Sequence, residues 1–253
     1  MMKINRKELT KKELKIYEIY LNKIVSWLKQ KVKAANASGV ALGISGGIDS
    51  ATLAFISKKA FNENAHFFYF KTRNDKYTED HVKKLEKKLG SEIKFIDLEK
   101  QYNDLIKTLD IQKKGSQANL KSRLFMTSIY SLSQDLNTLV LGTDNFDEFY
   151  LGYFTKYGDG GCDLLPFANI LKSDVYALAQ ILGVPDEIID KDPSANLYED
   201  QTDEKELGFS YYEFESYLRD KTSVNNEIKA KIEHFHKISN HKRDPLPKGP
   251  KIK

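Results

Sequence analysis

The sequence predicts an α/β fold, a doubly wound and mostly parallel sheet of about five strands with helices on both faces and extra C-terminal helices. Short apolar runs alternate with segments of helical periodicity between residues 11 and 182. The runs are continuously apolar, which is typical of strands that helices cover on both faces. The chain has 253 residues, 40% of them hydrophobic, enough for one sizeable core. We therefore expect one domain, 1–253, with its core at about 38–190.

The first half of the chain alternates helices and strands. Residues 11–35 repeat apolar side chains at three- and four-residue spacing, which predicts a long amphipathic helix. Residues 65–70 are rich in aromatic side chains and predict a strand. The expected helices are 11–35, 49–60, 78–89 and 98–109, and the expected strands are 40–44, 65–70 and 93–98.

The second half is less regular. We expect a basic loop at 113–117, a helix at 117–136, a strand at 138–141, a glycine-rich loop at 152–163, a short fifth strand at 164–167 and a helix at 172–182. Residues 190–207 are polar and predict a long mobile loop, either a lid over a site or a disordered segment. The remaining elements are helices at 211–219 and 225–238 and a basic, proline-containing tail at 239–253.

The composition excludes several classes of protein. Cys162 is the only cysteine, so the chain has no internal disulfide and no site built from paired cysteines. No stretch approaches the roughly 20 apolar residues that span a bilayer, and the first residues do not resemble a signal peptide. The net charge of +4 comes from interleaved lysines and acids, which indicates a solvated surface. We expect a cytoplasmic protein with no membrane or nucleic-acid partner.

A glycine turn follows the first strand. Gly46 and Gly47 let the backbone approach a ligand, and the first-turn amides of the next helix favour phosphate. Asp49 is itself negative, so beside a phosphate it fits a role in holding Mg²⁺. A strand–turn–helix with Gly47 placed only for close packing is the alternative. No Gly-Lys-Ser/Thr follows the glycines, so this is not a Walker loop and transfer of the γ-phosphoryl group is disfavoured.

Other polar residues follow neighbouring strands. Ligands of doubly wound sheets bind outside the carboxyl ends of the strands. The turn after residue 44, Arg73 after the second strand, and residues 143–148 after the fourth strand should therefore surround one crevice.

The string Ser-Gly-Gly-Ile-Asp-Ser at 45–50 resembles the loop of the ATP pyrophosphatases, which split ATP between the α- and β-phosphates. Over roughly residues 15–245 the chain resembles the ammonia-dependent NAD synthetases. The most specific string is Phe-Thr-Lys-Tyr-Gly-Asp-Gly-Gly at 154–161. The segments that carry the resemblance are 43–50, 142–145 with Glu148, 152–161, Lys172, 193–195, 201–204, 206–208 and 241–243.

The resemblance implies an adenylation followed by an amidation. The carboxylate of nicotinic acid adenine dinucleotide (deamido-NAD) attacks the α-phosphorus of ATP, pyrophosphate leaves, and ammonia attacks the acyl adenylate to give NAD and AMP. Both nucleophiles come from substrates, so the protein mainly has to position them and neutralise phosphate charge. The implied cofactor is Mg²⁺, and ATP is a co-substrate.

The resemblance also assigns residues. The matched metal ligands are Asp49 and Glu148, and the matched ATP-binding positions are Gly43, Ile44, Ser45, Gly46, Gly47, Ile48, Asp49, Ser50, Arg73, Thr143, Lys172 and Ser194. The matched deamido-NAD positions are Arg123, Lys156, Asp163, His241 and Lys242. We expect the catalytic set to be Asp49, Ser45, Lys172 and Asp159.

Some of these assignments leave alternatives open. Asp159 could shape its loop or bind ammonia, and the residues around Arg73 depart from the usual pattern. Lys172 opens a helix, where a cation opposes the dipole, so a phosphate partner would explain it; a solvated lysine is the alternative. His241 alone would be an ordinary surface histidine.

The family's members are two-fold dimers, so we expect a homodimer. The helices at 17–32 and 117–136 are candidate interface helices; the alternative is that each is buried within its own subunit. About forty residues precede the nucleotide loop, too few for the glutaminase domain of glutamine-dependent relatives, so free ammonia is the expected nitrogen donor. The alternatives are another ATP pyrophosphatase, such as a tRNA thiolation enzyme, which would need a sulfur-relaying cysteine, and a non-catalytic adenine-nucleotide sensor.

Overall fold

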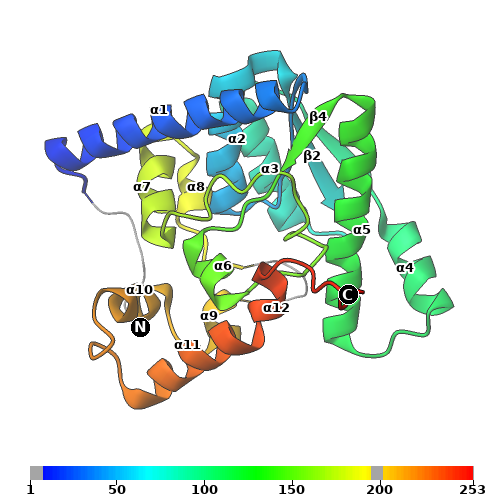
Figure 1. Ribbon diagram of the computed structural model, residues 1–253. Coiled ribbons are helices and arrows are strands. Elements are labelled where there is room, and N and C mark those ends of the chain that lie inside the picture. The colour runs from blue at the N-terminus through cyan, green and yellow to red at the C-terminus, as the bar shows by residue number, and fades with distance from the viewer. Residues whose placement is uncertain (1–7, 195–201, 253) are drawn as a thin grey trace.

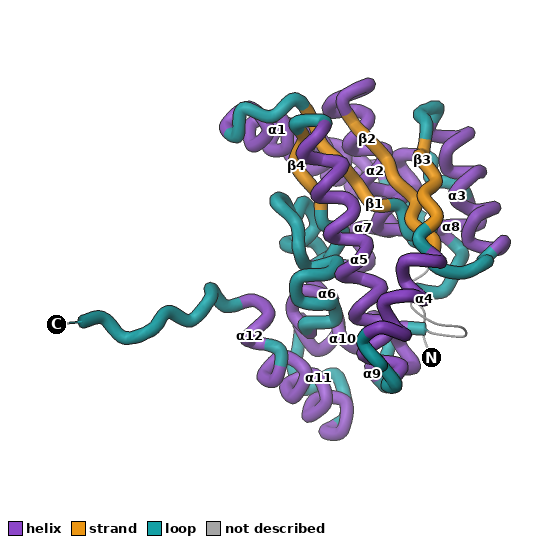
Figure 2. Tube along the Cα trace, turned by 90° about the vertical axis from the view of Figure 1, so that its right-hand side faces the viewer, coloured by secondary structure: helices purple, strands orange, loops and turns teal. Residues whose placement is uncertain are grey.

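Four parallel strands form the sheet in a computed structural model that describes residues 8–194 and 202–252. The strands are β1 (Gly39–Gly43), β2 (Ala65–Lys71), β3 (Ile93–Asp97) and β4 (Thr138–Leu141), in the order β3-β2-β1-β4 (Figure 2). Val40 lies opposite Ala65 on β2 and opposite Leu139 on β4. The chain moves outward from β1 to β3 and then returns to the other side of β1, so the strand order reverses between β1 and β4.

Helices cover both faces of this sheet (Figure 1). One face carries α1 (Lys11–Ala34), α2 (Ile48–Phe61), α3 (Lys76–Leu89), α7 (Lys172–Leu182) and α8 (Asp186–Ile189). Their apolar side chains, including Leu28, Leu53 and Leu178, form the main core with the strands. The opposite face carries α5 (Lys114–Asp135), where Ile129 packs against Ala41 and Phe68. The helix α4 (Glu99–Thr108) packs against α5. A short 3₁₀ helix, Asn62–Asn64, leads into β2.

The C-terminal helices form a second, smaller core beyond the carboxyl ends of the strands. They are α9 (Asp203–Leu207), α10 (Tyr211–Arg219), α11 (Asn226–Ile238) and α12 (Asn240–Arg243), and they pack with α6 (Phe146–Leu151). The buried members of this core are Leu151, Leu207, Phe209, Phe214, Tyr217 and Ile232. Because α6 follows β4 directly, this core fixes the C-terminal helices next to the edge of the sheet where ligands of such folds bind.

Local sequence explains where several helices begin and end. Thr10 and Glu13 form a reciprocal capping box at the start of α1. Asp75 caps α3, so this helix begins two residues earlier than predicted. Gly90 ends α3 and Gly183 ends α7, both in the left-handed conformation. The predicted α/β fold class is confirmed, and capping explains where these helices begin or end.

The predicted fifth strand at 164–167 is wrong. Leu164 makes a single parallel bridge to Leu141, and the chain then turns away. Pro166 has no backbone N–H to donate to a neighbouring strand, which stops the ladder after one residue. The sheet among the described residues accordingly has four strands.

Other predicted loops are partly helical. Gly115 lies inside α5, residues 203–207 of the predicted mobile loop form α9, and residues 240–243 of the predicted tail form α12. The helices α6 and α8 were not predicted, because four to six residues show too little periodicity. Residues 244–252 do extend away from the body (Figure 2). The lid or disorder prediction for 195–201 lies outside the described residues, and no described helix is long and apolar enough to cross a bilayer.

Candidate active site

The turn between β1 and α2 is built by its serines and glycines. Gly46 has φ of 75°, and a Cβ there would lie 2.9 Å from the Thr78 methyl group, so only glycine fits without strain. The backbone N–H of Ser45 donates to Ser50 Oγ at 3.2 Å, and the N–H of Gly47 donates to Ser45 Oγ at 3.2 Å. Ser50 Oγ in turn donates to the Gly47 carbonyl at 3.1 Å. The turn is thus held in one shape before any ligand binds.

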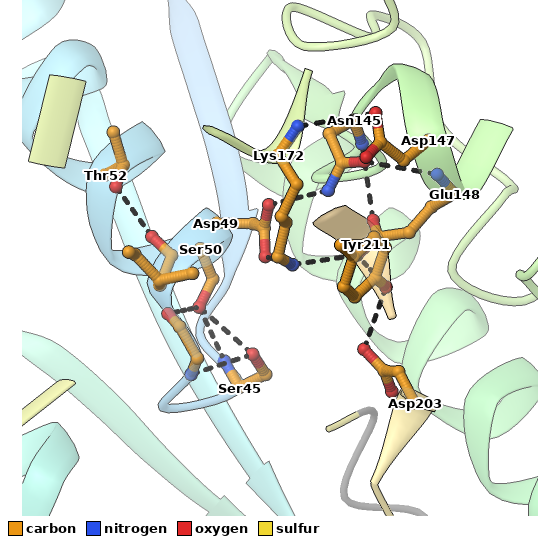
Figure 3. A network of polar contacts seen from close by, with 12 residues as sticks. Ser45, Asp49, Ser50, Thr52, Asn145, Asp147, Glu148, Lys172, Asp203 and Tyr211 are labelled. Carbon is orange, nitrogen blue, oxygen red and sulfur yellow. Dashed lines mark hydrogen bonds and ion pairs between the residues drawn. The ribbon is translucent and has the colours of Figure 1, made fainter. Parts of the chain in front are cut away.

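A lysine and two carboxylates form the charged centre of the site (Figure 3). Lys172 Nζ donates to Asp49 Oδ2 at 2.6 Å and to Glu148 Oε1 at 3.0 Å. Asp49 lies in the first turn of α2, Glu148 lies in α6 after β4, and Lys172 is the first residue of α7. Only 3% of the lysine side chain is exposed. The alternative of a solvated Lys172 is therefore wrong, and two carboxylates offset its unfavourable position at a helix start.

Neighbouring side chains fix these carboxylates. Asn145 Nδ2 donates to Asp49 Oδ1 at 2.9 Å, and Asn145 forms a capping box with Glu148 at the start of α6. From the C-terminal helices, the Tyr211 hydroxyl lies 3.4 Å from Glu148 Oε1 and donates to Asp203 Oδ2 at 3.0 Å. The Lys172 ammonium lies 5.2 Å from the centre of the Tyr211 ring. Elements far apart in the sequence thus converge on one ion pair.

Burial and neighbouring charges shift the pKa values in this centre. Burial raises the pKa of Glu148 to about 7, and Lys172 opposes that shift. Burial works against the charged form of Lys172, but the nearby carboxylates of Asp49 and Glu148 hold its pKa well above its usual value. Burial and then the negative charge of Asp159 raise the pKa of Asp144. Perturbed groups of this kind cluster at functional sites.

A cavity of about 260 Å³ opens at this edge of the sheet, at the reversal of strand order between β1 and β4. One wall is apolar, with Phe70, Phe125 and Ile129 among its residues. The predicted site residues that line the cavity are Gly43, Ile44, Ser45, Gly47, Ile48, Asp49, Arg73, Thr143, Glu148, Asp159, Lys172 and Ser194. Gly46 lies in the turn beside it, and Ser50 is buried in the first turn of α2.

Four of the five residues matched to deamido-NAD form a second group beside the cavity. Arg123 donates to the Lys156 carbonyl at 3.3 Å, and the Lys156 ammonium donates to the His241 carbonyl. Lys242 Nζ donates to the carbonyls of Gly152 and Phe154, both at 2.6 Å. These contacts tie the glycine-rich loop at 152–161 to α5 and α12.

Asp163 lies apart from that group. Its carboxylate accepts hydrogen bonds from the Tyr130 hydroxyl at 3.0 Å and from the Val140 N–H at 2.8 Å. Asp163 and Tyr130 line a separate groove along α5 and the β4 edge, which Met126 also lines. The structure therefore does not bring Asp163 together with Lys156 and His241.

Asp159 shapes its own loop. Its Oδ1 accepts from the Thr155 N–H at 2.9 Å and from Ser122 Oγ at 2.7 Å, while its N–H donates to Ser122 Oγ at 2.8 Å. Asp159 also lines the cavity, so its carboxylate is within reach of a ligand there.

The sequence profile described as NAD synthase matches residues 20–246. The NH(3)-dependent NAD(+) synthetase of Mycoplasmopsis pulmonis is 51% identical over 233 residues, covering 92% of this chain and 90% of that protein. This chain belongs to the NAD synthase family. The predicted family membership is thereby confirmed.

Solved structures agree with the NAD synthase assignment. The structure of NMN synthetase from Francisella tularensis superposes with a TM-score of 0.87 at 35% identity, covering 93% of this chain and 99% of that one. The NH3-dependent NAD synthetase from Campylobacter jejuni, solved in complex with the nitrate ion, gives a TM-score of 0.79 at 28% identity, again covering 93% and 99%.

The donor set of this NAD synthase fits Mg²⁺ that arrives with a nucleotide. Among the described residues no group of three or more His, Cys, Asp or Glu side chains could hold a metal ion. Asp49 and Glu148 nevertheless direct one oxygen each to a common point, where Lys172 Nζ lies. Mg²⁺ is commonly held by one or two carboxylates together with substrate phosphates and waters. The two carboxylates match that pattern.

Sequence reasoning missed several residues of this NAD synthase site. Asn145 lies in the matched segment 142–145 but was assigned no role, although Asn145 and Glu148 have the spacing of a capping box. Buried Lys121 and Asp144 line the cavity without having been assigned. Asp203 and Tyr211 reach the charged centre through tertiary packing, and no pattern in the neighbouring sequence indicates this contact.

Proposed function

We propose that this chain amidates deamido-NAD with ammonia, consuming ATP and releasing NAD, AMP and pyrophosphate through an acyl adenylate. The proposal rests on one observation: the Ser45–Gly47 turn lines the same cavity as the charged centre of Asp49, Glu148 and Lys172. Membership of the NAD synthase family supports this reaction, and NH(3)-dependent NAD(+) synthetases are among its relatives. As part of the proposal, the reaction takes place in the cytoplasm.

The triphosphate of ATP lies along the Ser45–Gly47 turn and the start of α2 in this proposal. The helix N-terminus favours the negative phosphates. The adenine ring stacks on the apolar wall that includes Phe70 and Phe125. Arg73, Thr143 and Ser194 line the same cavity and complete the ATP site.

The residues of the centre orient ATP and neutralise charge at the phosphates. The substrate carboxylate forms a bond to the α-phosphorus, the bond to the β-phosphate oxygen breaks, and pyrophosphate leaves with that electron pair. Lys172 is positioned to contact phosphate oxygens as charge develops on them. Bound Mg²⁺, held by Asp49 and Glu148, would supply further neutralisation of the phosphates. Asn145 and Tyr211 keep the carboxylates oriented.

The second group of residues binds deamido-NAD. Arg123, Lys156 and Lys242 bring positive charge beside the cavity, which suits the diphosphate and carboxylate of that substrate. Asp163 faces the separate groove along α5, and we propose that α5 is the interface of a homodimer in which this groove completes a substrate site. The apolar stripe of α1, in contrast, packs into the core of its own subunit. Ammonia enters next to Asp159, whose carboxylate lines the cavity.

Three alternatives differ in what they require. A tRNA thiolation enzyme needs a reactive thiolate, but burial and then nearby carboxylates raise the pKa of Cys162 to about 12, so its thiol stays protonated and inert. The likeness to an NMN synthetase structure raises nicotinic acid mononucleotide as a second candidate substrate. A nucleotide sensor would not need the paired carboxylates.

Turnover assays separate these possibilities. The purified chain is incubated with ATP, Mg²⁺ and ammonium, and with either deamido-NAD or nicotinic acid mononucleotide, while pyrophosphate and amidated product are measured. We expect a higher kcat/KM for deamido-NAD than for the mononucleotide. A preference for the mononucleotide would replace the proposed substrate, and nucleotide binding without pyrophosphate release would support the sensor.

A further inference from the structure

The ammonium of Lys172 occupies the point that Asp49 and Glu148 share. It contacts Asp49 Oδ2 at 2.6 Å and Glu148 Oε1 at 3.0 Å, and the three side chains are 3%, 16% and 13% exposed. The other two carboxylate oxygens already accept from Asn145, Asp49 Oδ1 from its side chain and Glu148 Oε2 from its backbone N–H. Every oxygen of the pair therefore has a donor in this arrangement.

A divalent cation at this pair would need the two oxygens that the lysine holds. An ammonium and a divalent cation repel each other strongly at contact distance in a buried site. The lysine and the cation thus compete for Asp49 Oδ2 and Glu148 Oε1. The lysine competes effectively because its backbone is fixed: the Lys172 N–H donates to Asp147 Oδ1 at 3.4 Å, and α7 packs into the main core.

We propose that, without nucleotide, the Lys172 ammonium occupies the metal position between Asp49 and Glu148. When Mg²⁺ and ATP bind together, the ammonium moves to the phosphates and Mg²⁺ takes its position. This inference rests on the proposed function, because it takes Asp49 and Glu148 as the metal ligands. The side chain leaves the carboxylates for the triphosphate at the neighbouring Ser45–Gly47 turn, which lines the same cavity. As a consequence, the metal binds weakly alone and tightly with the nucleotide.

Titration with Mn²⁺, followed by electron paramagnetic resonance without nucleotide, tests the competition. Lys172→Met removes the competing charge at similar length and should bind Mn²⁺ about tenfold more tightly or better than the native chain, since the pair it breaks is buried. Lys172→Arg keeps the charge and should bind as weakly as the native chain. The double variant Lys172→Met/Asp49→Asn should lose the gain, which locates the added metal at this pair.

Equal Mn²⁺ affinity in the native chain and in Lys172→Met would overturn the exchange. A gain that persists in the double variant would also overturn it, because the metal would lie elsewhere. The native turnover assay with deamido-NAD is independent of both results, so a failure of the exchange is distinguishable from a failure of the proposed function.

A second measurement needs no variant that could fail to fold. In protein labelled with ¹⁵N-lysine, the buried Lys172 ammonium should give a slowly exchanging resonance that Mg²⁺ alone leaves unchanged. Mg²⁺ with α,β-methylene-ATP should shift it. A large shift with Mg²⁺ alone, or no shift with both, would contradict the exchange.

Discussion

Replacing Asp49 by asparagine tests the centre of the site with the smallest change in shape. Asparagine keeps the volume of the side chain, and its one carbonyl oxygen can accept from Asn145 Nδ2, now 2.9 Å from Asp49 Oδ1, while its amide nitrogen no longer accepts from Lys172. It removes the negative charge that lies 2.6 Å from Lys172 Nζ. The substitution therefore removes a charge and a metal ligand while leaving the packing of α2 intact.

The two consequences differ in size. Lys172 keeps Glu148 as its partner at 3.0 Å, so the free energy of unfolding should fall by only about 1.5–3 kcal/mol, the range for a charged hydrogen bond. Turnover should fall by at least about 10²- to 10³-fold, because charge neutralisation at the phosphates is lost in the transition state. The variant should thus be folded and nearly inactive.

Pyrophosphate release at saturating ATP, deamido-NAD, ammonium and Mg²⁺ measures the activity, and urea unfolding measures the stability. Asp97→Asn is the matched control, since Asp97 is an exposed carboxylate at the end of β3 that pairs with Lys71 at 3.4 Å. It should keep turnover within about twofold of the native value. Native-like turnover of Asp49→Asn would refute the reasoning, and so would a matching loss in Asp97→Asn.

Three further changes have separate readouts. Lys156→Ala should raise the KM for deamido-NAD about tenfold or more and leave the KM for ATP unchanged. Lys94→Ala on β3 is the control and should change neither KM. An effect confined to the KM for ATP would count against the assignment of Lys156 to deamido-NAD. Burial lowers the pKa of Lys121 from 10.5 to about 8. The folded chain therefore loses the Lys121 proton at a lower pH than the unfolded chain, so the free energy of unfolding rises as pH increases from about 8 towards 10.5. Lys121→Met should be more stable than the native chain at pH 7 by about 1–3 kcal/mol, and its urea unfolding should lack this rise with pH. The same rise with pH in Lys121→Met and in the native chain would contradict the role of Lys121. Gly142→Ala should lower the free energy of unfolding by about 1–3 kcal/mol, because its Cβ would lie 2.5 Å from Cys162 Sγ. Adding Cys162→Ala should restore part of the lost stability. Equal stability of the single and double variants would argue against that clash.

The part of the site that the sequence predicts depends on local rules. A strand followed by a glycine turn and a helix fixes Ser45 and Asp49 at the carboxyl end of β1, whatever the rest of the chain does. Parallel strands place their carboxyl ends at one edge, so Thr143 and Glu148 after β4 had to lie nearby. Both line the same cavity as the turn.

The missed part depends on tertiary packing and on short elements. Tyr211 and Asp203 reach Glu148 because the C-terminal helices bury their own apolar core against α6, over sequence separations that no local pattern reports. The helix α6 has six residues, too few for a periodic signal, yet it orients Glu148. Division of the chain into a core at about 38–190 and a C-terminal part stays a prediction.

The central claim is that a triphosphate and a divalent cation bind where the turn after β1 meets Asp49 and Glu148. A crystal structure with α,β-methylene-ATP and Mn²⁺, with anomalous scattering to locate the manganese, tests it most directly. We predict an anomalous peak in contact with Asp49 and Glu148 and phosphates along the Ser45–Gly47 turn. A triphosphate bound elsewhere, with no peak beside either carboxylate, would contradict the account.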